Sequence, residues 1–464
     1  MQGLEIAEVN WSELEFTNRI DAEYYRPKHL SAENLLTTRG GVALSSVANF
    51  IIGPFGSAFA VENFTDESTY RYIRGKDVKS MKLEEGDNVY MPKSDFDRLS
   101  KYSLNSGDIL ISVVGTLGNS ALVEEIHLPA IFSCKSTAVR VKTVDPRYLL
   151  AYLNSEYGRN LLLRKERGAV QKGLNLDDLK SLVVFVGGAE LQSKVACTFD
   201  ASRKAGNEAS SQLLKAEATL VNVLGLDTWN PPEALSYVRS SSEAFSAGRL
   251  DAEHYHPRFD ALLGLIDATG AAAKLGNHLK ENKRGKQPNY VDSGLPVVNS
   301  KHVLRNEIRL DNENRLASFD ENDLLISQDD VLMNGTGVGT IGRVAAYLHE
   351  CQAVPDNHVT VLRPKDELDP VYLSVFLNSI AGQLQVEQRL RGSSGQIELY
   401  PNDIAEFRVW LAPKALQQSI RKQVEQSFAQ KQRAAQLLDA AKRAVEIAIE
   451  DSEAAALAYL DALK

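Results

Sequence analysis

The sequence has few cysteines, no long apolar run and no excess of basic residues. Its three cysteines, Cys134, Cys197 and Cys351, stand far apart without paired spacing. This excludes a disulfide framework and a cysteine zinc site, so we expect buried free thiols. No apolar run approaches the roughly 20 residues that cross a bilayer, and residues 1–10 lack the basic and apolar regions of a signal peptide. We therefore expect a cytoplasmic protein.

The charge balance is acidic. The 61 acidic and 52 basic residues give a formal net charge of -9. This argues against a protein that coats nucleic acid by bulk attraction, although it permits local basic patches. A chain of 464 residues exceeds one typical core, so we expect two or more domains.

Two stretches have the apolar periodicity of long helices. In residues 190–224 the stripe consists of Leu191, Val195, Thr198, Ser202, Ala205, Ala209, Leu213, Ala216, Leu220 and Val223. Near the C-terminus it consists of Leu416, Ile420, Val424, Phe428, Ala435, Leu438, Ala441, Val445 and Ala448. The spacing predicts that the two helices bury these stripes against each other. Two helices that each pack on their own domain would show the same spacing.

A duplication is the strongest signal. Motifs of the first half return in the same order in the second: Arg19-Ile-Asp-Ala-Glu-Tyr-Tyr-Arg-Pro27 as Arg249-Leu-Asp-Ala-Glu-His-Tyr-His-Pro257, Tyr72-Ile-Arg-Gly-Lys-Asp-Val78 as Val297-Val-Asn-Ser-Lys-His-Val303, Gly115-Thr-Leu-Gly118 as Gly339-Thr-Ile-Gly342, Asp145-Pro-Arg-Tyr-Leu-Leu-Ala-Tyr-Leu-Asn-Ser155 as Asp369-Pro-Val-Tyr-Leu-Ser-Val-Phe-Leu-Asn-Ser379, and Arg167-Gly168 as Arg391-Gly392. A repeat this long indicates a duplicated domain, not a short solenoid module.

Each half is predicted to be a mixed α+β globule followed by a long helix. In the first half we expect a helical entry over residues 22–36, a helix after Asp145-Pro146, and strands at 109–114, 121–123, 137–141 and 182–186. In the second half we expect a helix after Asp369-Pro370 and strands at 324–326, 359–362 and 407–411. The predicted boundaries are a domain at 1–189, a central helix at 190–225, a domain at 226–414 and a C-terminal helix at 415–464. Residues 451–464 exceed the length of the central helix, and the sequence leaves open whether they continue the spacer or fold back.

Two motifs suggest enzymes, but their context argues otherwise. Gly337-Val-Gly-Thr-Ile-Gly342 fits the G-x-G-x-x-G string of dinucleotide sites, which needs a helix directly after it. Residues 343–347 read as a strand, so we interpret the string as a tight turn. Asn230-Pro-Pro-Glu233 resembles a loop of amino-methyltransferases but lacks the aromatic residue that stacks on a base, and we interpret it as a linker. We predict neither a catalytic nor a metal site.

Polar and basic loops occupy matching places in both halves. Arg and Lys can bind phosphates or guanine edges, and Asn and Gln can pair with adenine edges. A single charged run usually marks a solvated face, but its repetition in two domains favours DNA contact. The candidate contacts are Ser57, Arg74, Lys76, Lys135, Ser136, Arg164, Lys165, Arg167, Gln171 and Lys172 in the first half, and Lys283, Arg284, Lys286, Gln287, Asn299, Lys301, His302, Asn357, His358, Arg391, Ser393, Ser394 and Gln396 in the second.

With the duplication, the two helices and local motifs such as Gly53-Pro-Phe-Gly-Ser57 and Gly107-Asp-Ile-Leu110, the sequence resembles the DNA specificity subunit of type I restriction-modification systems. The resemblance covers almost the whole chain. It implies an α+β fold with two tandem duplicated α/β target recognition domains, each followed by a long helix, and it implies that the two helices pair as an antiparallel coiled coil.

The resemblance also implies a function without chemistry of its own. Each domain would read one half of a split double-stranded DNA target, and the helices would dock two DNA adenine methyltransferase subunits. An ATP-dependent restriction and translocation subunit is a further expected partner. S-adenosylmethionine, ATP and Mg are expected in those partners and no cofactor in this chain.

The helix pair has a length suited to this role. A helix of about 35 residues is roughly 50 Å long, enough to hold two readers about one DNA turn of about 34–36 Å apart. The residues expected at the helix-pair and partner interface are Leu191, Val195, Leu213, Leu220, Leu416, Ile420, Val424, Phe428, Leu438 and Val445.

Three alternatives remain open from the sequence. One is the recognition subunit of a related phage-defence methylation system without a restriction arm. Another is a self-contained DNA methyltransferase or nuclease. Such an enzyme would need a catalytic domain, but the two domains and two helices already account for nearly all residues. The third is a coiled-coil scaffold without DNA contact, which the two large mixed domains disfavour.

Overall fold

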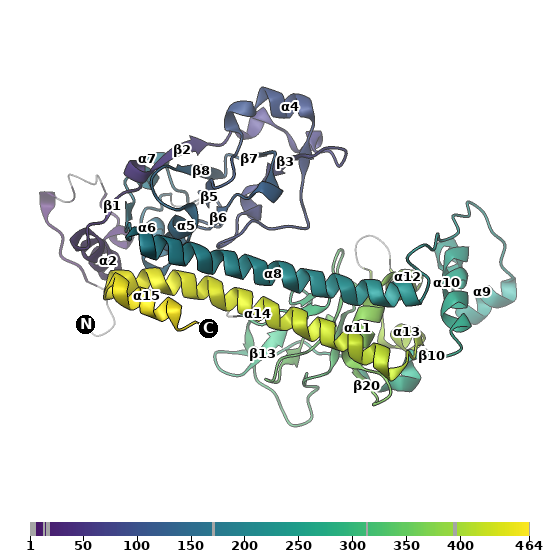
Figure 1. Cartoon of the computed structure of the whole chain (residues 1–464). Helices are drawn as coiled ribbons and strands as arrows, with labels where there is room; N and C mark the ends of the chain where they lie inside the picture. The colour runs from purple at the N-terminus through teal and green to yellow at the C-terminus, as the bar shows by residue number, and fades with distance from the viewer. Residues whose placement is uncertain are drawn as a thin grey trace. The chain divides into compact units, whose positions relative to one another are not determined.

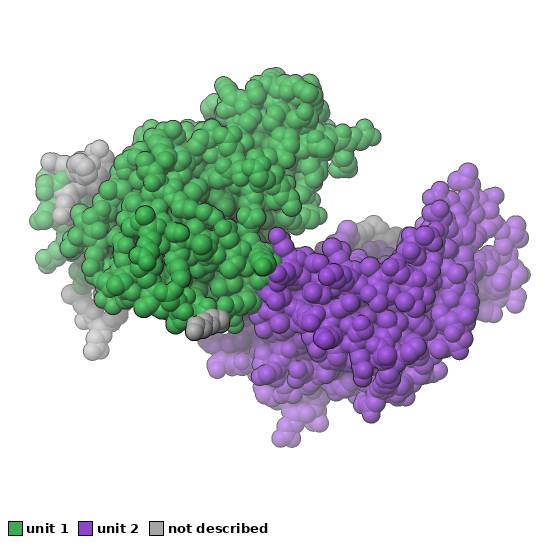
Figure 2. Space-filling model, viewed as in Figure 1, with its two compact units in different colours: residues 1–205, 433–464 green, residues 206–432 purple. Residues whose placement is uncertain are grey.

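The computed structural model describes residues 6–12, 14, 19–168, 172–311, 314–392 and 397–463. The chain forms two compact units (Figure 2). Unit 1 comprises Met1–Ala205 with Arg433–Lys464, and unit 2 comprises Gly206–Gln432. Both units combine helices with sheets, which confirms the predicted α+β class and the tandem arrangement. Within those residue ranges no helix has the length and apolar character of a membrane span.

Unit 1 is built on a four-stranded antiparallel sheet in the order β2-β8-β5-β6. These strands are β2 (Ala48–Ile52), β5 (Ile109–Ser112), β6 (Ser120–Leu122) and β8 (Ser136–Val141). A second sheet has the order β4-β3-β7, in which β3 pairs in parallel with β7. The remaining strands are β1 (Val42–Ala43), β3 (Tyr70–Ile73), β4 (Tyr90–Met91), β7 (Ala130–Phe132) and β9 (Val183–Val184), and β1 pairs with β9.

Short helices lie around both sheets of unit 1 (Figure 1). They are α2 (Pro27–Thr38), α3 (Leu44–Val47), α4 (Lys93–Arg98), α5 (Pro146–Asn154), α6 (Glu156–Arg164) and α7 (Leu176–Lys180), with short 3-10 turns η1 (Ala22–Tyr25), η2 (Gly56–Ala58), η3 (Val61–Asn63), η4 (Gly75–Asp77), η5 (Ser100–Tyr102) and η6 (Glu125–His127). Helix α5 begins where predicted, because Pro146 suits a first turn and the Asp145 carboxylate accepts a hydrogen bond from the Arg147 amide at 2.8 Å. Its Tyr148 and Tyr152 are fully buried in the core.

Unit 2 repeats this topology. Its main sheet has the order β11-β20-β17-β18, and in its second sheet, β12-β16-β13-β19, β13 again pairs in parallel with β19. The strands are β10 (Ala272–Lys274), β11 (Leu279–Arg284), β12 (Tyr290–Val291), β13 (Leu295–Val298), β14 (Val303–Leu304), β15 (Glu307–Ile308), β16 (Leu316–Ala317), β17 (Val331–Asn334), β18 (Val344–Ala346), β19 (Val354–Pro355), β20 (Val359–Pro364) and β21 (Arg408–Trp410). The helices and 3-10 turns are α9 (Ser241–Ala247), η7 (Ala252–Tyr255), α10 (Pro257–Ala268), η8 (Leu275–His278), α11 (Pro370–Asn378), α12 (Ile380–Arg389) and α13 (Pro401–Ala405).

The predicted strand over residues 324–326 is wrong. Ile326 forms only an isolated bridge with Ala353. The strand that corresponds to β5 of unit 1 is β17, which pairs with β18 on one side and β20 on the other. Both runs are short and apolar, so the difference lies in the available partners: a strand with two neighbours has its backbone groups hydrogen-bonded along both edges.

The two long helices are α8 (Ala189–Val223) and α14 (Lys414–Glu450), and each contributes one part to each unit. Within unit 1 the two parts run antiparallel. The Gly188 amide donates to the Glu453 carboxylate at 3.0 Å, and the Ser202 hydroxyl donates to the Ala434 carbonyl at 2.7 Å. Residue numbers therefore rise along the first segment while they fall along the second. The coiled-coil pairing along the full helices stays a prediction.

The C-terminal segment corrects the predicted single helix over 415–464. Helix α14 ends at Glu450, and a new helix, α15 (Glu453–Asp461), follows (Figure 1). Ser452 caps it, because its hydroxyl accepts a hydrogen bond from the Ala455 amide at 3.2 Å. Ala456 and Leu460 then join the buried core of unit 1, so the chain turns back onto its own unit instead of extending the long helix.

Two smaller expectations have opposite outcomes. The cysteines are free, but Cys134 is half-buried and Cys197 and Cys351 are exposed, so the expected burial is wrong. The interpretation of residues 337–342 as a turn is confirmed, because they connect β17 with β18 and the φ angles of their glycines are positive, between 78° and 97°.

Candidate nucleic-acid interface

In unit 1, loops that are distant in sequence meet at the loop between β7 and β8. The Val113 amide, just after β5, donates to the Lys135 carbonyl at 2.9 Å. The Leu174 amide donates to the Val113 carbonyl at 3.0 Å, and the Ser133 amide donates to the Ile73 carbonyl, at the end of β3, at 2.9 Å. The predicted DNA-contact loops of the first half are therefore gathered in one place, which we call loop cluster 1 and define as residues 53–57, 74–77, 113–118, 133–136 and 172–174.

Glycines allow two of these loops to approach closely. A Cβ atom at Gly53 would lie 2.5 Å from the Ser133 carbonyl oxygen, and one at Gly75 would lie 2.7 Å from the Cβ of Lys135. At distances this short, a side chain at either position would force the neighbouring loops to shift apart. The loops after β2 and β3 thus rest directly on the loop that carries Lys135.

Unit 2 contains the same junction. The Gly335 amide, just after β17, donates to the His358 carbonyl at 2.9 Å, and the Leu399 amide donates to the Gly335 carbonyl at 2.9 Å. A Cβ atom at Gly285 would lie 2.4 Å from the Asp356 carbonyl oxygen. We call this loop cluster 2 and define it as residues 285–289, 299–302, 335–340, 356–358 and 397–400.

Exposed polar side chains remain at both clusters. Lysines 135, 286 and 301 are exposed and form no ion pair among the residues whose positions the structure gives. Ser57, Gln287 and His358 are exposed as well, while Asn299 and Asn357 are half-buried. The His358 ring nitrogen lies 2.7 Å from the Thr336 hydroxyl. These groups can meet phosphates and base edges.

Arg167 and Arg391, predicted as DNA contacts, hold equivalent internal ion pairs. The Arg167 guanidinium donates to both oxygens of Asp178 at 2.7 and 2.9 Å, and Arg391 donates to Asp403 at 2.8 Å. These hydrogen bonds raise the pKa of both arginines. Each pair fastens its loop to the short helix that follows, α7 or α13, so the first role of these arginines is structural.

The most strongly repeated motif serves the same loops. Arg19 donates to the Glu166 carbonyl at 2.9 Å, and Arg249 donates to the Leu390 carbonyl at 3.0 Å. Both arginines also pair with the aspartate two positions later. The repeated motif therefore anchors the chain just before each loop arginine: residues 19–27 hold the segment before Arg167, and residues 249–257 hold the segment before Arg391.

Burial overturns four predicted contacts. Ser136, Arg164, Lys165 and His302 are buried, with exposed fractions of 0%, 4%, 9% and 3%. Arg164 is used internally, since it donates to the Tyr24 carbonyl at 2.8 Å and pairs with Glu33. Burial also lowers the pKa of Lys165 and of His302, because the charged forms lose hydration. Such side chains cannot reach DNA without opening the fold.

Other predicted cations are neutralised locally. Lys76 pairs with Asp87 and Lys283 pairs with Glu281, each at 2.8 Å, and Lys172 pairs with Glu166. Arg74 pairs with Asp77 at 2.9 Å, and Arg284 lies 5.3 Å above the Tyr400 ring. The exposed pairs can still exchange a carboxylate for a phosphate, because surface ion pairs are weak. Gln171, Ser393, Ser394 and Gln396 lie outside the described residues.

The predicted interface residues of the helices lie mainly in the cores. Leu191, Val195 and Val445 belong to the core of unit 1, and Leu438 packs against it. Leu220, Ile420 and Val424 belong to the core of unit 2, and Leu213 and Leu416 pack against it. Phe428 packs edge to face on His349, with ring centroids 5.3 Å apart.

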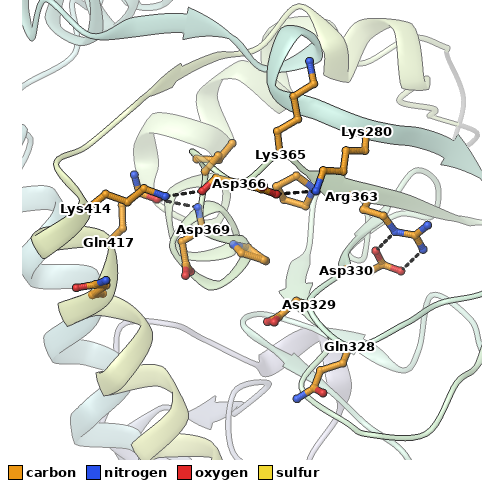
Figure 3. A pocket seen from close by; sticks show the side chains of 14 residues that line it. Lys280, Gln328, Asp329, Asp330, Arg363, Lys365, Asp366, Asp369, Lys414 and Gln417 are labelled. Atoms are coloured by element: carbon orange, nitrogen blue, oxygen red, sulfur yellow. Dashed lines mark hydrogen bonds and ion pairs between the residues drawn. The ribbon is translucent and has the colours of Figure 1, made fainter.

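A polar pocket of unit 2 lies beside the start of α14 (Figure 3). Its cations already have carboxylate or carbonyl partners: Lys280 pairs with Asp366 at 2.7 Å, Lys414 donates to the Asp366 carbonyl, and Arg363 pairs with the buried Asp330 at 2.7 Å. This pocket therefore offers little free positive charge for a phosphate. No group of three or more His, Cys, Asp or Glu side chains could hold a metal ion in the described part of the chain.

Comparison with known proteins places these features in context. No family model matches the sequence. The specificity subunit of the EcoKI type I restriction enzyme of Escherichia coli K12 is 22% identical over 408 residues, which cover 83% of this chain and 81% of that protein. The chain resembles a type I specificity subunit. This similarity confirms the resemblance predicted from the motifs, and it agrees with the prediction of a non-catalytic subunit.

Solved structures of the same class align over similar lengths. A type I restriction-modification S subunit from M. genitalium is 14% identical, with a TM-score of 0.38, and the alignment covers 91% of this chain and 95% of that one. The HsdS subunit from Thermoanaerobacter tengcongensis is 15% identical, with a TM-score of 0.27 and the same coverage of 91% and 95%.

Sequence reasoning missed one conspicuous side chain of loop cluster 1. Phe55 is 85% exposed, although it lies inside the motif at residues 53–57 that drew attention to Ser57. Aromatic residues are usually counted toward the core, so the sequence alone did not single it out. The available signal was its position between two glycines, which is typical of a turn and not of a core strand.

Proposed function

We propose that this chain is the non-catalytic DNA specificity subunit of a type I restriction-modification complex. The observation that carries the proposal is the duplicated loop cluster. In each unit, strand-end loops meet through equivalent hydrogen bonds at Lys135 or His358 and present exposed polar side chains. The similarity to the EcoKI specificity subunit along 83% of the chain supports the same function.

Each loop cluster reads one half of a split target in double-stranded DNA. Lysines 135, 286 and 301 position the duplex through its phosphates, and Ser57, Gln287 and Asn357 reach base edges. The ion-paired Arg167 and Arg391 act indirectly, by holding their loops in place. The target therefore consists of two short specific parts with an unspecified spacer between them.

The long helices α8 and α14 act as the spacer and dock the partner subunits. We propose two DNA adenine methyltransferase subunits, because two equivalent units offer two equivalent positions along the chain. An ATP-dependent restriction and translocation subunit is a further partner. Methyl transfer with S-adenosylmethionine, and ATP hydrolysis with Mg, take place in those subunits.

A genome-wide methylation map of the host tests the proposal. The map is compared between cells with the gene intact, cells with the gene deleted, and deleted cells that carry the gene again on a plasmid. We expect one split adenine motif to disappear on deletion and to return on complementation. An uninterrupted motif would contradict the two-reader model. If no motif changes while the gene is expressed, the proposal fails unless the chain co-purifies with a silent methyltransferase.

A further inference from the structure

Phe55 is an aromatic side chain held in solvent by a fixed backbone. Its ring is 85% exposed, whereas Pro54 before it and Phe59 after it are buried. The Ala58 amide donates to the Phe55 carbonyl at 2.8 Å, and Arg98 donates to the Ala58 carbonyl at 2.8 Å. The loop is thus fixed by the burial of Pro54 before Phe55 and by hydrogen bonds after it, while the Phe55 side chain remains outside the core.

The position of this ring connects it with loop cluster 1. Gly53, two residues earlier, packs against the backbone of Ser133 and Cys134, and Lys135 follows directly with an exposed side chain. The corresponding loop of unit 2, residues 285–289, carries Lys286, Gln287 and Asn289 and has no aromatic residue. The two clusters therefore differ in chemistry at the same place in the fold.

We propose that Phe55 is a specificity-determining residue that contacts the C5-methyl group of a thymine in the half-site read by unit 1. The assignment rests on the proposed function. In the major groove the thymine methyl is the apolar feature among base edges that otherwise present donors and acceptors, and Phe is a suitable partner for it. A rigid ring can make this contact with little loss of conformational freedom, while the adjacent Lys135 meets a phosphate.

Single exposed apolar residues are common on protein surfaces, so the test must detect the methyl contact itself. Once the target is mapped, the purified complex with its methyltransferase is titrated with duplexes in which each thymine of the target is replaced in turn by uracil. This change removes only the methyl group. For the wild-type complex we expect one uracil position, in one half-site, to lower affinity about fourfold, the effect of one buried methyl group.

Two variants show whether that methyl group meets Phe55. With Phe55→Ala we expect weaker binding of the thymine duplex and no further loss with uracil at the sensitive position. With Phe55→Leu, which keeps an apolar side chain, we expect part of the uracil effect to return. Uracil in the other half-site should act equally on all complexes, because that half-site is read by unit 2 and does not meet Phe55.

Ile126→Ala is the matched control. Ile126 is 82% exposed in unit 1, but it follows β6 at the end of the sheet where Leu122 pairs with Ile109, away from Val113 and loop cluster 1. We expect wild-type affinity and a wild-type uracil effect. Both Phe55→Ala and Ile126→Ala should unfold at the denaturant concentration of the wild type, since both side chains are exposed.

The outcomes separate this inference from the proposed function. If the target is split and depends on this chain, but Phe55→Ala keeps the full uracil effect, the thymine contact is wrong and the proposed function stands. The same holds if Phe55→Ala weakens binding without changing the response to uracil, as expected of a ring inserted between bases. If deletion of the gene changes no methylated motif, the proposed function fails and Phe55 loses its role with it.

Discussion

Among the glycines of loop cluster 1, Gly53 is the one at which a Cβ atom would approach a neighbouring loop most closely. Its missing side chain leaves room for the Ser133 carbonyl, 2.5 Å from where a Cβ atom would lie, whereas a Cβ atom at Gly56 would meet nothing within 4 Å. We expect Gly53→Ala to separate the two loops and to destabilise unit 1 by about 1–3 kcal/mol, as overpacking does. Affinity for one half-site should fall as well. Gly56→Ala should leave the stability of unit 1 unchanged.

Denaturant unfolding and DNA titration of the two glycine variants provide the measurement. Hydrogen exchange of residues 53–59 should speed up in Gly53→Ala alone, because its loop loses the contact with residues 133–135. Equal behaviour of the two variants would mean that the close approach at Gly53 contributes nothing to the site.

Single residues also show where sequence reasoning stops. Arg167 and Arg391 could be identified as equivalent from the repeat, but not as ion-paired, because Asp178 and Asp403 become their partners only when the intervening loop closes. The burial of His302 depends likewise on residues distant in the chain. The sequence shows which residues are charged, but only the folded structure shows which of them are exposed and without an ion-pair partner.

Among the helices, α15 is short and lies near the C-terminus, yet it contributes to the core of unit 1. Leu460 is 5% exposed within the core of unit 1, whereas Leu214 on α8 is 67% exposed. We expect Leu460→Ala to destabilise unit 1 by about 2–5 kcal/mol, the range for truncating a buried leucine. Leu214→Ala should cost less than about 0.5 kcal/mol. Urea denaturation of both variants measures the difference, and similar midpoints would contradict the fold-back of α15.

The elements that could be predicted are those with strong local signals. The long periods of α8 and α14, and the Asp-Pro starts of α5 and α11, suffice to place these helices. The sequence leaves open whether residues 451–464 continue the long helix, because Ala456 and Leu460 continue the apolar spacing, although Ser452 carries a capping signal. The strand at 324–326 was misplaced because strand identity depends on pairing with distant segments.

For the whole molecule, the acidic balance constrains how DNA is held. The net charge is -9, and several loop cations are already paired with carboxylates, among them Lys76, Lys172 and Lys283. Lysines 135, 286 and 301 are the exposed cations of the two clusters that form no ion pair with any residue that the structure describes. Under the proposed function, phosphate neutralisation by this chain alone is therefore modest, and the proposed partner subunits would supply most of it.

This division of labour predicts weak, salt-sensitive DNA binding by the isolated chain. Each lost phosphate contact lowers the slope of log affinity against log salt by about 0.9. Replacing lysines 135, 286 and 301 by Ala should therefore reduce the slope of the complex by about 2 to 3.

Replacing the exposed lysines 28, 204 and 422, which lie on helices α2, α8 and α14, makes the same change in net charge and should leave the slope nearly unchanged. Equal slopes for both triple variants would remove the loop clusters from the phosphate interface, and tight specific binding by the isolated chain at physiological salt would contradict the role of the partners.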